Sequence, residues 1–282
     1  MRKTKLKIGI TGGRGIIGTE FREYYKKNFK FIIFKEDICI KKKIDFWIKK
    51  YKPEIIIHLA AVVETAKVNR NRKKAKNINY VGTKNLIEVL KKNNLKPWFF
   101  FSSSSHVYNF SKKKLIEKSN CNPITYYGKL KLQTEKYLLK NKKNLPICIA
   151  RIFSFTHHKQ NKQYFIPSIY QRILKKKNLN HDSLKKEFRD FLSTKDICRA
   201  IKILIDNRYC GLINICSSKS TCLNDIIKFF KGDIKKIKNK QPNLNSKKSF
   251  NYLIGNNKKL IKLGFKSQSN INTILRNYKK RK

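Results

Sequence analysis

The feature that most constrains the fold is a glycine-rich turn near the N-terminus. "TGGRGIIG" (11–18) follows the short β-rich run "KLKIGI" and precedes the helical pattern "TEFREYYKKN". A strand, a glycine turn and a helix in this order begin a βαβ unit. Gly12, Gly15 and Gly18 allow a tight turn and a close approach of a pyrophosphate, and the helix N-terminus supplies N–H donors. The turn therefore predicts a dinucleotide site.

Strand and helix patterns keep alternating through the first half of the chain. Apolar strand-like runs lie at 5–10, 29–34, 53–61, 96–105 and 145–155, and helical patterns at 77–94 and 124–142. Nearly continuous apolar strands are typical of a parallel sheet covered on both faces. We predict an α/β fold, a Rossmann-type doubly wound parallel sheet with a smaller C-terminal substrate-binding cap.

The length of 282 residues allows one large domain with a smaller appendage. We expect the NAD(P)-binding sheet domain at 1–154, with 189–215 returning to it. The substrate-binding domain is expected at 155–188 and 216–282. Ligands of such sheets bind beyond the carboxyl ends of the strands, and the glycine turn, "HLAA", the serine run and "RIFSF" all fall there.

The composition limits the partners. The formal net charge is +51, but 56 lysines and 12 arginines are spread along the whole chain. Nucleic-acid surfaces cluster their charge and use arginine forks, so we interpret this charge as a solvated surface that helps attract an anionic substrate. The seven cysteines form no CxxC pair, which predicts reduced thiols and no metal. The longest apolar run is too short to span a bilayer, and we expect a cytoplasmic protein without membrane contact.

Two adjacent tyrosines in "TYYGKLK" (125–131) raise the question of an acid/base residue. In a helix, residues four apart share a face, so Tyr127 has Lys131 as its neighbour, whereas Tyr126 has Leu130. An ammonium beside a phenol lowers the phenol pKa, and moving it from about 10 toward 7 needs roughly 4 kcal/mol. We therefore expect Lys131, together with an oxidised nicotinamide in a partly desolvated cleft, to lower the pKa of Tyr127.

Several motifs in order give the chain a family resemblance. "TGGRGIIG", "PEIIIHLAA", "NYVGTKNLIE", "SSSSHVY", "YGKLK", "RDFLSTKDICRAI" and "GLINICSS" resemble segments of the extended short-chain dehydrogenase/reductase family, in its NAD-dependent epimerase/dehydratase branch acting on nucleotide sugars. This resemblance covers nearly the whole chain. It implies Tyr127 as the catalytic acid/base, Lys131 as the residue that binds the nicotinamide ribose, and Ser104 as the residue that polarises the carbonyl.

The resemblance also suggests residues around the substrate. Ser105 and His106 follow the serine strand and face the expected substrate region, and Arg189 in "RDF" is a candidate for diphosphate contacts or for an ion pair between domains. Asn79 is expected to be structural, and His58 to pack at the end of a strand.

The cofactor choice stays open between NAD and NADP. Glu36 lies at the usual distance beyond the glycine turn for an acidic residue that binds a free ribose, whereas Arg14 and Lys35 would suit a 2′-phosphate. The expected cofactor contacts are Gly12, Gly15, Ile16, Ile17, Lys35, Glu36, Asp37, Ile38, Leu59, Ala60, Ala61 and Lys131.

The resemblance implies three reactions: dehydration, epimerisation and 4-keto reduction. Dehydratases of the family carry an Asp-Glu pair where this chain has Ser105 and His106, which argues against dehydration. "RIFSFTHHKQNKQYFIPSI" is similar to the substrate segment of GDP-4-keto-6-deoxymannose reductases. We therefore predict a 4-ketoreductase of a nucleotide-diphosphate sugar. The alternative is a 4-epimerase with tightly bound NAD, and the third possibility is a catalytically inactive relative that binds a nucleotide or RNA. The resemblance further implies a homodimer.

Overall fold

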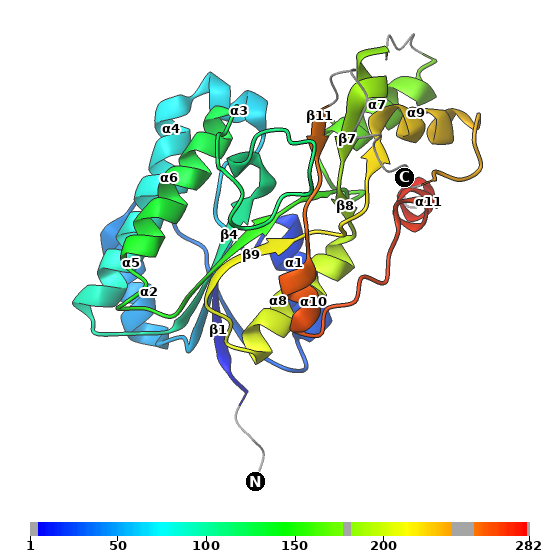
Figure 1. Cartoon of the computed structure of the whole chain (residues 1–282). Helices are drawn as coiled ribbons and strands as arrows, with labels where there is room; N and C mark the ends of the chain where they lie inside the picture. The colour runs from blue at the N-terminus through cyan, green and yellow to red at the C-terminus, as the bar shows by residue number, and fades with distance from the viewer. Residues whose placement is uncertain (1–4, 177–181, 239–250, 281–282) are drawn as a thin grey trace.

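A six-stranded parallel sheet forms the centre of the computed structural model (Figure 1). The structure describes all residues except 1–4, 177–181, 239–250 and 281–282. The sheet order is β2-β1-β3-β4-β5-β9, so the chain runs outward in one direction, returns to the centre and continues the other way. Its strands are β1 (Lys7–Thr11), β2 (Lys30–Phe34), β3 (Ile55–His58), β4 (Trp98–Ser104), β5 (Ile147–Ile152) and β9 (Gly211–Ile215). The predicted Rossmann-type sheet is confirmed.

Helices cover both faces of this sheet. On one face lie α1 (Ile16–Tyr25) and α8 (Thr194–Asp206), which contact each other and share a core with β1 and β3. The other face is covered by α2 (Lys41–Tyr51), α5 (Gly82–Lys92) and α6 (Tyr126–Lys140), visible together beside the sheet in Figure 1. Both faces of β3 and β5 are buried, which explains why their sequences are apolar rather than alternating.

Short elements connect these layers at the carboxyl ends of the strands. They are α3 (Thr65–Arg70), α4 (Arg72–Lys76), a π-helical turn η1 (Asn77–Val81) and a 3-10 turn η2 (Ser105–Val107). The helical pattern predicted over 77–94 therefore begins with a π turn, whose wider winding shifts the register of its side chains relative to α5.

The later part of the chain builds a second, smaller core. Strands β10 (Thr221–Cys222), β7 (Glu187–Arg189) and β11 (Asn251–Leu253) form a three-stranded sheet, and β6 (Ser154–Phe155) pairs with β8 (Phe191–Leu192). The accompanying helices are α7 (Phe165–Leu174), η3 (Asp182–Lys186), α9 (Leu223–Lys231) and α11 (Ile271–Lys280). Apolar residues of α7, α9 and α11 pack together in one cluster.

One segment of the expected cap packs elsewhere. Helix α10 (Lys258–Lys262) contacts β9, and Leu260 and Phe265 are buried in the core of the main sheet. The division of the chain into a sheet domain and a cap stays a prediction, and 258–265 is the part of 216–282 that this packing would assign to the sheet domain. Among the described residues, no helix is both long and apolar enough to cross a membrane.

Candidate functional site

The glycine turn has the geometry of an anion-binding loop. Gly12 adopts φ +68°, and a Cβ there would lie 2.6 Å from the backbone nitrogen of Ala60, so only glycine fits between β1 and β3. A Cβ on Gly18 would lie 2.7 Å from the Cα of Gly13, so this glycine lets α1 pack onto the turn. Gly15 is the N-cap of α1, where no side chain caps the helix. The first N–H groups of α1 are therefore available to a phosphate.

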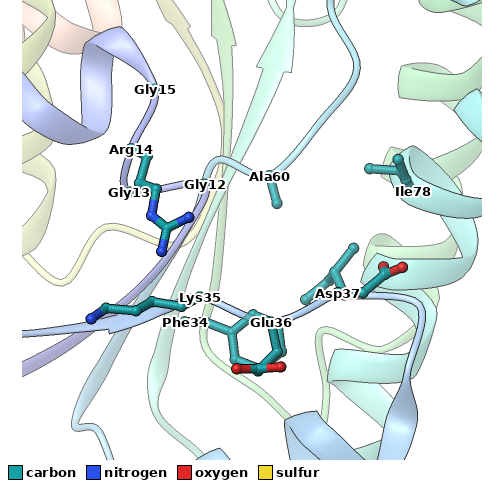
Figure 2. Close-up of a pocket in the computed structure, with 11 residues that line it drawn as sticks. Gly12, Gly13, Arg14, Gly15, Phe34, Lys35, Glu36, Asp37, Ala60 and Ile78 are labelled. Atoms are coloured by element: carbon teal, nitrogen blue, oxygen red, sulfur yellow. The ribbon is translucent and has the colours of Figure 1, made fainter.

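A pocket opens directly beyond this turn (Figure 2). It lies at the carboxyl ends of β1, β2 and β3, where parallel sheets bind nucleotides. Its lining consists of Gly12, Gly13, Arg14, Gly15, Phe34, Lys35, Glu36, Asp37, Ile38, Ala60 and Ile78.

Seven of the predicted cofactor contacts line this pocket, namely Gly12, Gly15, Lys35, Glu36, Asp37, Ile38 and Ala60. Five others do not line it: Ile16 and Ile17 in the first turn of α1, Leu59 and Ala61 beside Ala60, and Lys131 on α6. Sequence reasoning missed Gly13, Phe34 and Ile78. Ile78 comes from the π turn, whose register the helical periodicity does not show.

The pocket carries charges of both signs. Figure 2 shows the Arg14 guanidinium hanging from the glycine turn toward the end of β2, where Lys35 and Glu36 follow one another. The Glu36 carboxylate is half exposed and lies 3.7 Å from the ammonium of Lys43. Asp37 accepts a hydrogen bond of 2.8 Å from the backbone N–H of Cys39. Two basic groups and two carboxylates thus line this pocket.

The predicted catalytic residues meet at the carboxyl end of β4. Tyr127 lies in the first turn of α6, and its side chain is hydrogen-bonded with Ser104, the last residue of β4. Lys131, one helical turn further, places its ammonium 5.8 Å from the centroid of the Tyr127 ring and donates 2.6 Å to the carbonyl oxygen of Ser102. All three side chains are buried. Sequence spacing and strand register therefore bring Ser104, Tyr127 and Lys131 together.

The electrostatics of this group differ from our expectation. Burial raises the pKa of Tyr127, and the hydrogen bond with Ser104 opposes that rise only in part. Burial also lowers the pKa of Lys131 to about 7. The Tyr127 pKa shift is thus opposite in sign to the one we expected from Lys131 and an oxidised nicotinamide together, because desolvation is its largest cause and the Lys131 ammonium donates to the Ser102 carbonyl.

A glycine makes the contact between α6 and β4 possible. A Cβ on Gly128 would collide with the backbone oxygen of His106. Thr125 caps α6 by accepting a 3.0 Å hydrogen bond from the Gly128 N–H. This close approach fixes the start of α6 against η2 and so determines where Tyr127 lies. The signal was present in "YYGKLK", in the glycine that follows the tyrosine pair.

The predicted substrate residues Ser105 and His106 lie in η2 beside Tyr127, and Arg189 lies on β7. The His106 ring packs edge-on against the Tyr127 ring at 5.8 Å between centroids, and Ser105 is buried in the same 3-10 turn. The Arg189 guanidinium stacks 5.0 Å from the centroid of the Phe110 ring and pairs with Glu187 at 2.5 Å. The His106 side chain is solvent-exposed, and the desolvation by surrounding protein atoms, followed by the charge of Arg189, lowers its pKa.

Two further predicted residues have structural partners. The His58 ring is buried between the hydroxyls of Thr11 and Thr83, at 2.6 and 2.8 Å, and burial lowers its pKa to about 3. Asn79 makes two hydrogen bonds to the backbone of Val62 and so holds the loop after β3 against the π turn. These contacts tie the ends of β1 and β3 to the helix layer.

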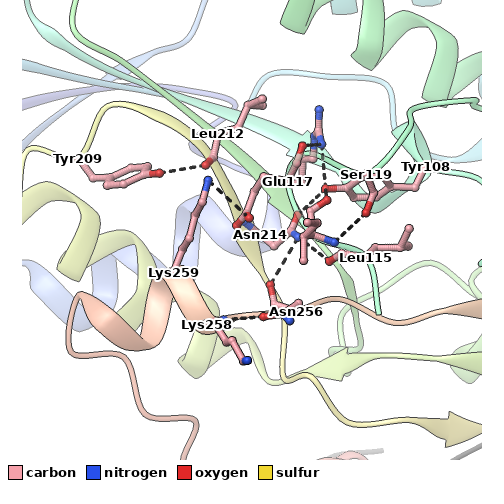
Figure 3. A network of polar contacts seen from close by, with 12 residues as sticks. Tyr108, Leu115, Glu117, Ser119, Tyr209, Leu212, Asn214, Asn256, Lys258 and Lys259 are labelled. Carbon is pink, nitrogen blue, oxygen red and sulfur yellow. Dashed lines mark hydrogen bonds and ion pairs between the residues drawn. The ribbon is translucent and has the colours of Figure 1, made fainter. Parts of the chain in front are cut away.

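Behind the catalytic group lies a buried polar network, part of which Figure 3 shows. Tyr108 donates 2.9 Å to the side chain of Asn214 on β9 and accepts 2.8 Å from Arg151 on β5. Asn214 donates 2.9 Å to the carbonyl of Leu115, and its backbone N–H donates 2.9 Å to Glu117. The network therefore anchors the loop after η2 to the sheet.

Comparisons with known proteins identify the family of this chain. A profile of the NAD dependent epimerase/dehydratase family matches residues 8–216. The chain is 28% identical over 240 residues to a dTDP-D-glucose 4,6-dehydratase of Dictyostelium discoideum, a match that covers 71% of this chain and 55% of that protein. It is 26% identical over 186 residues to a GDP-6-deoxy-D-mannose reductase of Pseudomonas aeruginosa, covering 62% and 61%. The matches thus span less than two thirds of these two relatives.

Further similarities point to the same group of proteins. A UDP-glucose 4-epimerase of Mycoplasma genitalium is 25% identical over 241 residues, covering 70% of each chain. Among solved structures, RMD from Pseudomonas aeruginosa with NADPH has a TM-score of 0.82 at 21% identity, covering 98% of this chain and 99% of that one. A Thermus thermophilus UDP-glucose 4-epimerase with NAD has a TM-score of 0.82 at 15% identity, covering 97% and 99%. These structural similarities show a shared fold.

Proposed function

Because this chain belongs to the NAD dependent epimerase/dehydratase family, we propose that it is an NAD(P)-dependent 4-ketoreductase of a nucleotide-linked 4-keto-6-deoxyhexose. The observation that carries the proposal is the buried group of Ser104, Tyr127 and Lys131. It lies at the same edge of the sheet as the glycine pocket, because β1 and β4 are parallel and both end there.

The residues of the pocket fit a dinucleotide. The cradle of Gly12 and Gly15 would hold the pyrophosphate at the N-terminus of α1, with Asp37, Ile38 and Ile78 around the adenosine. Lys131 would bind the nicotinamide ribose. When bound in its reduced form, the cofactor supplies a hydride.

Tyr127 suits the acid role in a reduction. Because burial raises its pKa, the phenol keeps its proton at neutral pH and can give it to the alkoxide that develops at the sugar C4 oxygen. The Ser104 hydroxyl, hydrogen-bonded with Tyr127, would donate to the same oxygen and stabilise its charge. The two residues thus place two donors at one substrate oxygen.

The surroundings of Tyr127 support reduction over dehydration. Dehydration needs an additional acid and base, and the positions implied for them hold Ser105 and His106. His106 has a lowered pKa, so it is neutral at pH 7 and packs edge-on against the tyrosine. We assign Ser105, His106 and Arg189 to substrate binding, with Arg189 as the candidate partner of the diphosphate.

A 4-epimerase is the second candidate. The match to the Mycoplasma genitalium epimerase covers a larger share of both chains than the match to the reductase does. An epimerase would first use Tyr127 as a base, and the raised pKa makes the phenolate scarce.

We also propose that the protein is cytoplasmic and forms a homodimer through α5 and α6.

Turnover with defined substrates tests the proposal. The purified protein is incubated with NADH or NADPH and with 4-keto-6-deoxy sugars linked to GDP, dTDP or UDP, and the loss of reduced cofactor is followed. We expect oxidation of cofactor with one of these sugars and formation of the 4-hydroxy product. Interconversion of 4-epimers without net cofactor loss, with NAD retained through purification, would replace the reductase by the epimerase. No turnover with any of them would reject both.

A further inference from the structure

The end of β4 and one face of α6 are joined by three consecutive contacts. Tyr127, Lys131 and Glu135 are spaced four residues apart, so they share one face of α6. Their partners are three successive serines of β4: Ser104 for Tyr127, the carbonyl of Ser102 for Lys131, and the Ser103 hydroxyl for Glu135. The first two contacts belong to the proposed catalytic group. The third has no part in the proposed reaction and needs a separate explanation.

The Glu135 carboxylate costs free energy to bury on the face of α6 that contacts β4. Its side chain is 1% exposed, and a buried carboxylate needs charged partners and hydrogen bonds to be tolerated. Arg151 on β5 supplies them through a bidentate pair, with the closest N–O distance at 2.6 Å. Arg151 is in turn held by the Tyr108 hydroxyl at 2.8 Å and the Glu117 carbonyl at 3.0 Å.

We propose that Glu135 is a positioning residue of the active site: through Ser103 it fixes the register of α6 on β4, and its negative charge keeps Lys131 in the ammonium form. This inference rests on the proposed function only in the role given to Lys131. Glu135 lies one helical turn beyond Lys131 on the same face of α6, where its negative charge acts on the Lys131 ammonium.

The other charged and titratable groups around this pair do not supply that charge. His58 on β3 faces Lys131 and is neutral, since burial lowers its pKa to about 3. Tyr127 on α6 remains a protonated phenol, and β4 contributes the Phe101 ring and the Ser102 carbonyl. Arg151 on β5 and Cys121 in the loop after η2 lie near Glu135, and burial raises the pKa of that thiol.

The electrostatics agree with this geometry. Burial lowers the pKa of Lys131 to about 7, and the charge of Glu135 is the factor that raises it again. Without that carboxylate, the lysine would lose its proton at a lower pH. The ammonium form, which binds a ribose hydroxyl as a donor, would then be scarce at neutral pH.

The test compares Glu135→Gln with a matched control, Glu117→Gln. Glu117 is another buried carboxylate of the same network, but it accepts from the Asn214 N–H at 2.9 Å and lies 3.6 Å from the Lys259 ammonium. Because Glu135→Gln leaves Arg151 without its ion pair, the double variant Glu135→Gln/Arg151→Met is made as well, which removes both buried charges together.

The first readout is the pH dependence of kcat. In Glu135→Gln, we expect the fall of kcat with rising pH to move to lower pH by about one unit, the shift that loss of a nearby opposite charge produces. In the double variant, which also removes the positive charge of Arg151, we expect a smaller shift in the same direction. Glu117→Gln should leave the pH at which kcat falls unchanged. A well-folded Glu135 variant with an unshifted profile, or an equal shift in Glu117→Gln, would overturn the inference.

The second readout does not need turnover. The pH titration of Lys131 is followed by NMR of protein carrying 13C-labelled lysine, with the Lys131 signal assigned by comparison with Lys131→Met, and it reports the charged fraction of this one side chain. A lower apparent pKa in both Glu135 variants supports the inference even if no nucleotide sugar is reduced and the proposed function fails. An unchanged apparent pKa overturns it even if the wild-type protein is an active reductase.

Discussion

The ammonium nitrogen of Lys131 lies 5.8 Å from the centroid of the Tyr127 ring, in a site where both side chains are buried. One helical turn of α6 sets this separation. The same burial moves the two pKa values in opposite directions, up for the phenol and down for the amine. The pair therefore holds a proton donor next to a cation whose charge is costly to keep.

Replacing Tyr127 by phenylalanine should remove the proton donor while leaving the pocket intact. We expect kcat to fall by about 10²–10⁴-fold, the usual contribution of a general acid, with the Kd of the cofactor unchanged. Tyr126→Phe is the matched control, because Tyr126 packs on the Arg72 guanidinium at 5.1 Å, outside the catalytic group. Steady-state kinetics and fluorescence titration of the cofactor check both. Equal losses in the two variants would contradict the assignment.

Lys131 should make the stability of the protein depend on pH. Its folded-state pKa of about 7 lies below the ordinary value of 10.5, so the unfolded chain binds more protons between these limits and stability rises with pH there. Relative to Lys131→Met, the wild-type free energy of unfolding should increase by about 3 kcal/mol between pH 7 and 9.5. Urea unfolding of both proteins at the two pH values measures this. A constant difference would mean that Lys131 is charged throughout.

Arg14 should discriminate between the two cofactors. Its guanidinium lines the pocket together with Lys35, where a 2′-phosphate would lie. We expect Arg14→Ala to raise the Kd of NADPH by about 10- to 100-fold relative to that of NADH, since a charged hydrogen bond contributes about 1.5–3 kcal/mol. Glu36→Gln should shift the ratio the opposite way by removing repulsion. If Arg14→Ala weakens the binding of both cofactors equally, Arg14 shapes the glycine turn and does not contact the 2′-phosphate.

Gly128→Ala should inactivate the protein through geometry alone. The new methyl group would meet the backbone oxygen of His106, so α6 or η2 must move and Tyr127 must leave Ser104. We expect a loss of kcat of at least about 100-fold together with a lower Tm, because a small displacement of catalytic groups has that effect. Lys129→Ala, at the exposed neighbouring position, serves as the control. Wild-type kcat in Gly128→Ala would show that this close approach does not determine the site.

Local sequence patterns were enough to predict the parallel sheet, the glycine turn and the placement of Tyr127 and Lys131 on one helical face. They were enough because each depends on residues within one strand, one turn or one helical face. The pocket residue Ile78 was missed for the same reason: a π turn of five residues changes the register without leaving a mark in a 3.6-residue periodicity.

The sequence did not show which polar side chains are buried, nor which residues far apart in the chain form hydrogen bonds with each other. The partners of Arg151 and Asn214 lie on other elements, Tyr108 being 43 and 106 positions away in the chain. The Tyr127 pKa shift has the opposite sign to our expectation because the spacing shows a nearby cation but not the desolvation that burial causes. Glu135 was not recognised, since a glutamate on a lysine-rich helix looks like a surface residue until Ser103 and Arg151 are seen around it.

The most direct measurement is the transfer of a labelled hydride. The protein is incubated with reduced nicotinamide cofactor carrying deuterium at C4 and with a 4-keto-6-deoxy nucleotide sugar, and the sugar is analysed by mass spectrometry and NMR. The account predicts one deuterium at C4 of a 4-hydroxy product with the wild-type chain, and at least about 100-fold slower incorporation with Tyr127→Phe. A sugar that gains no deuterium from either cofactor, or incorporation at an equal rate in Tyr127→Phe, would contradict it.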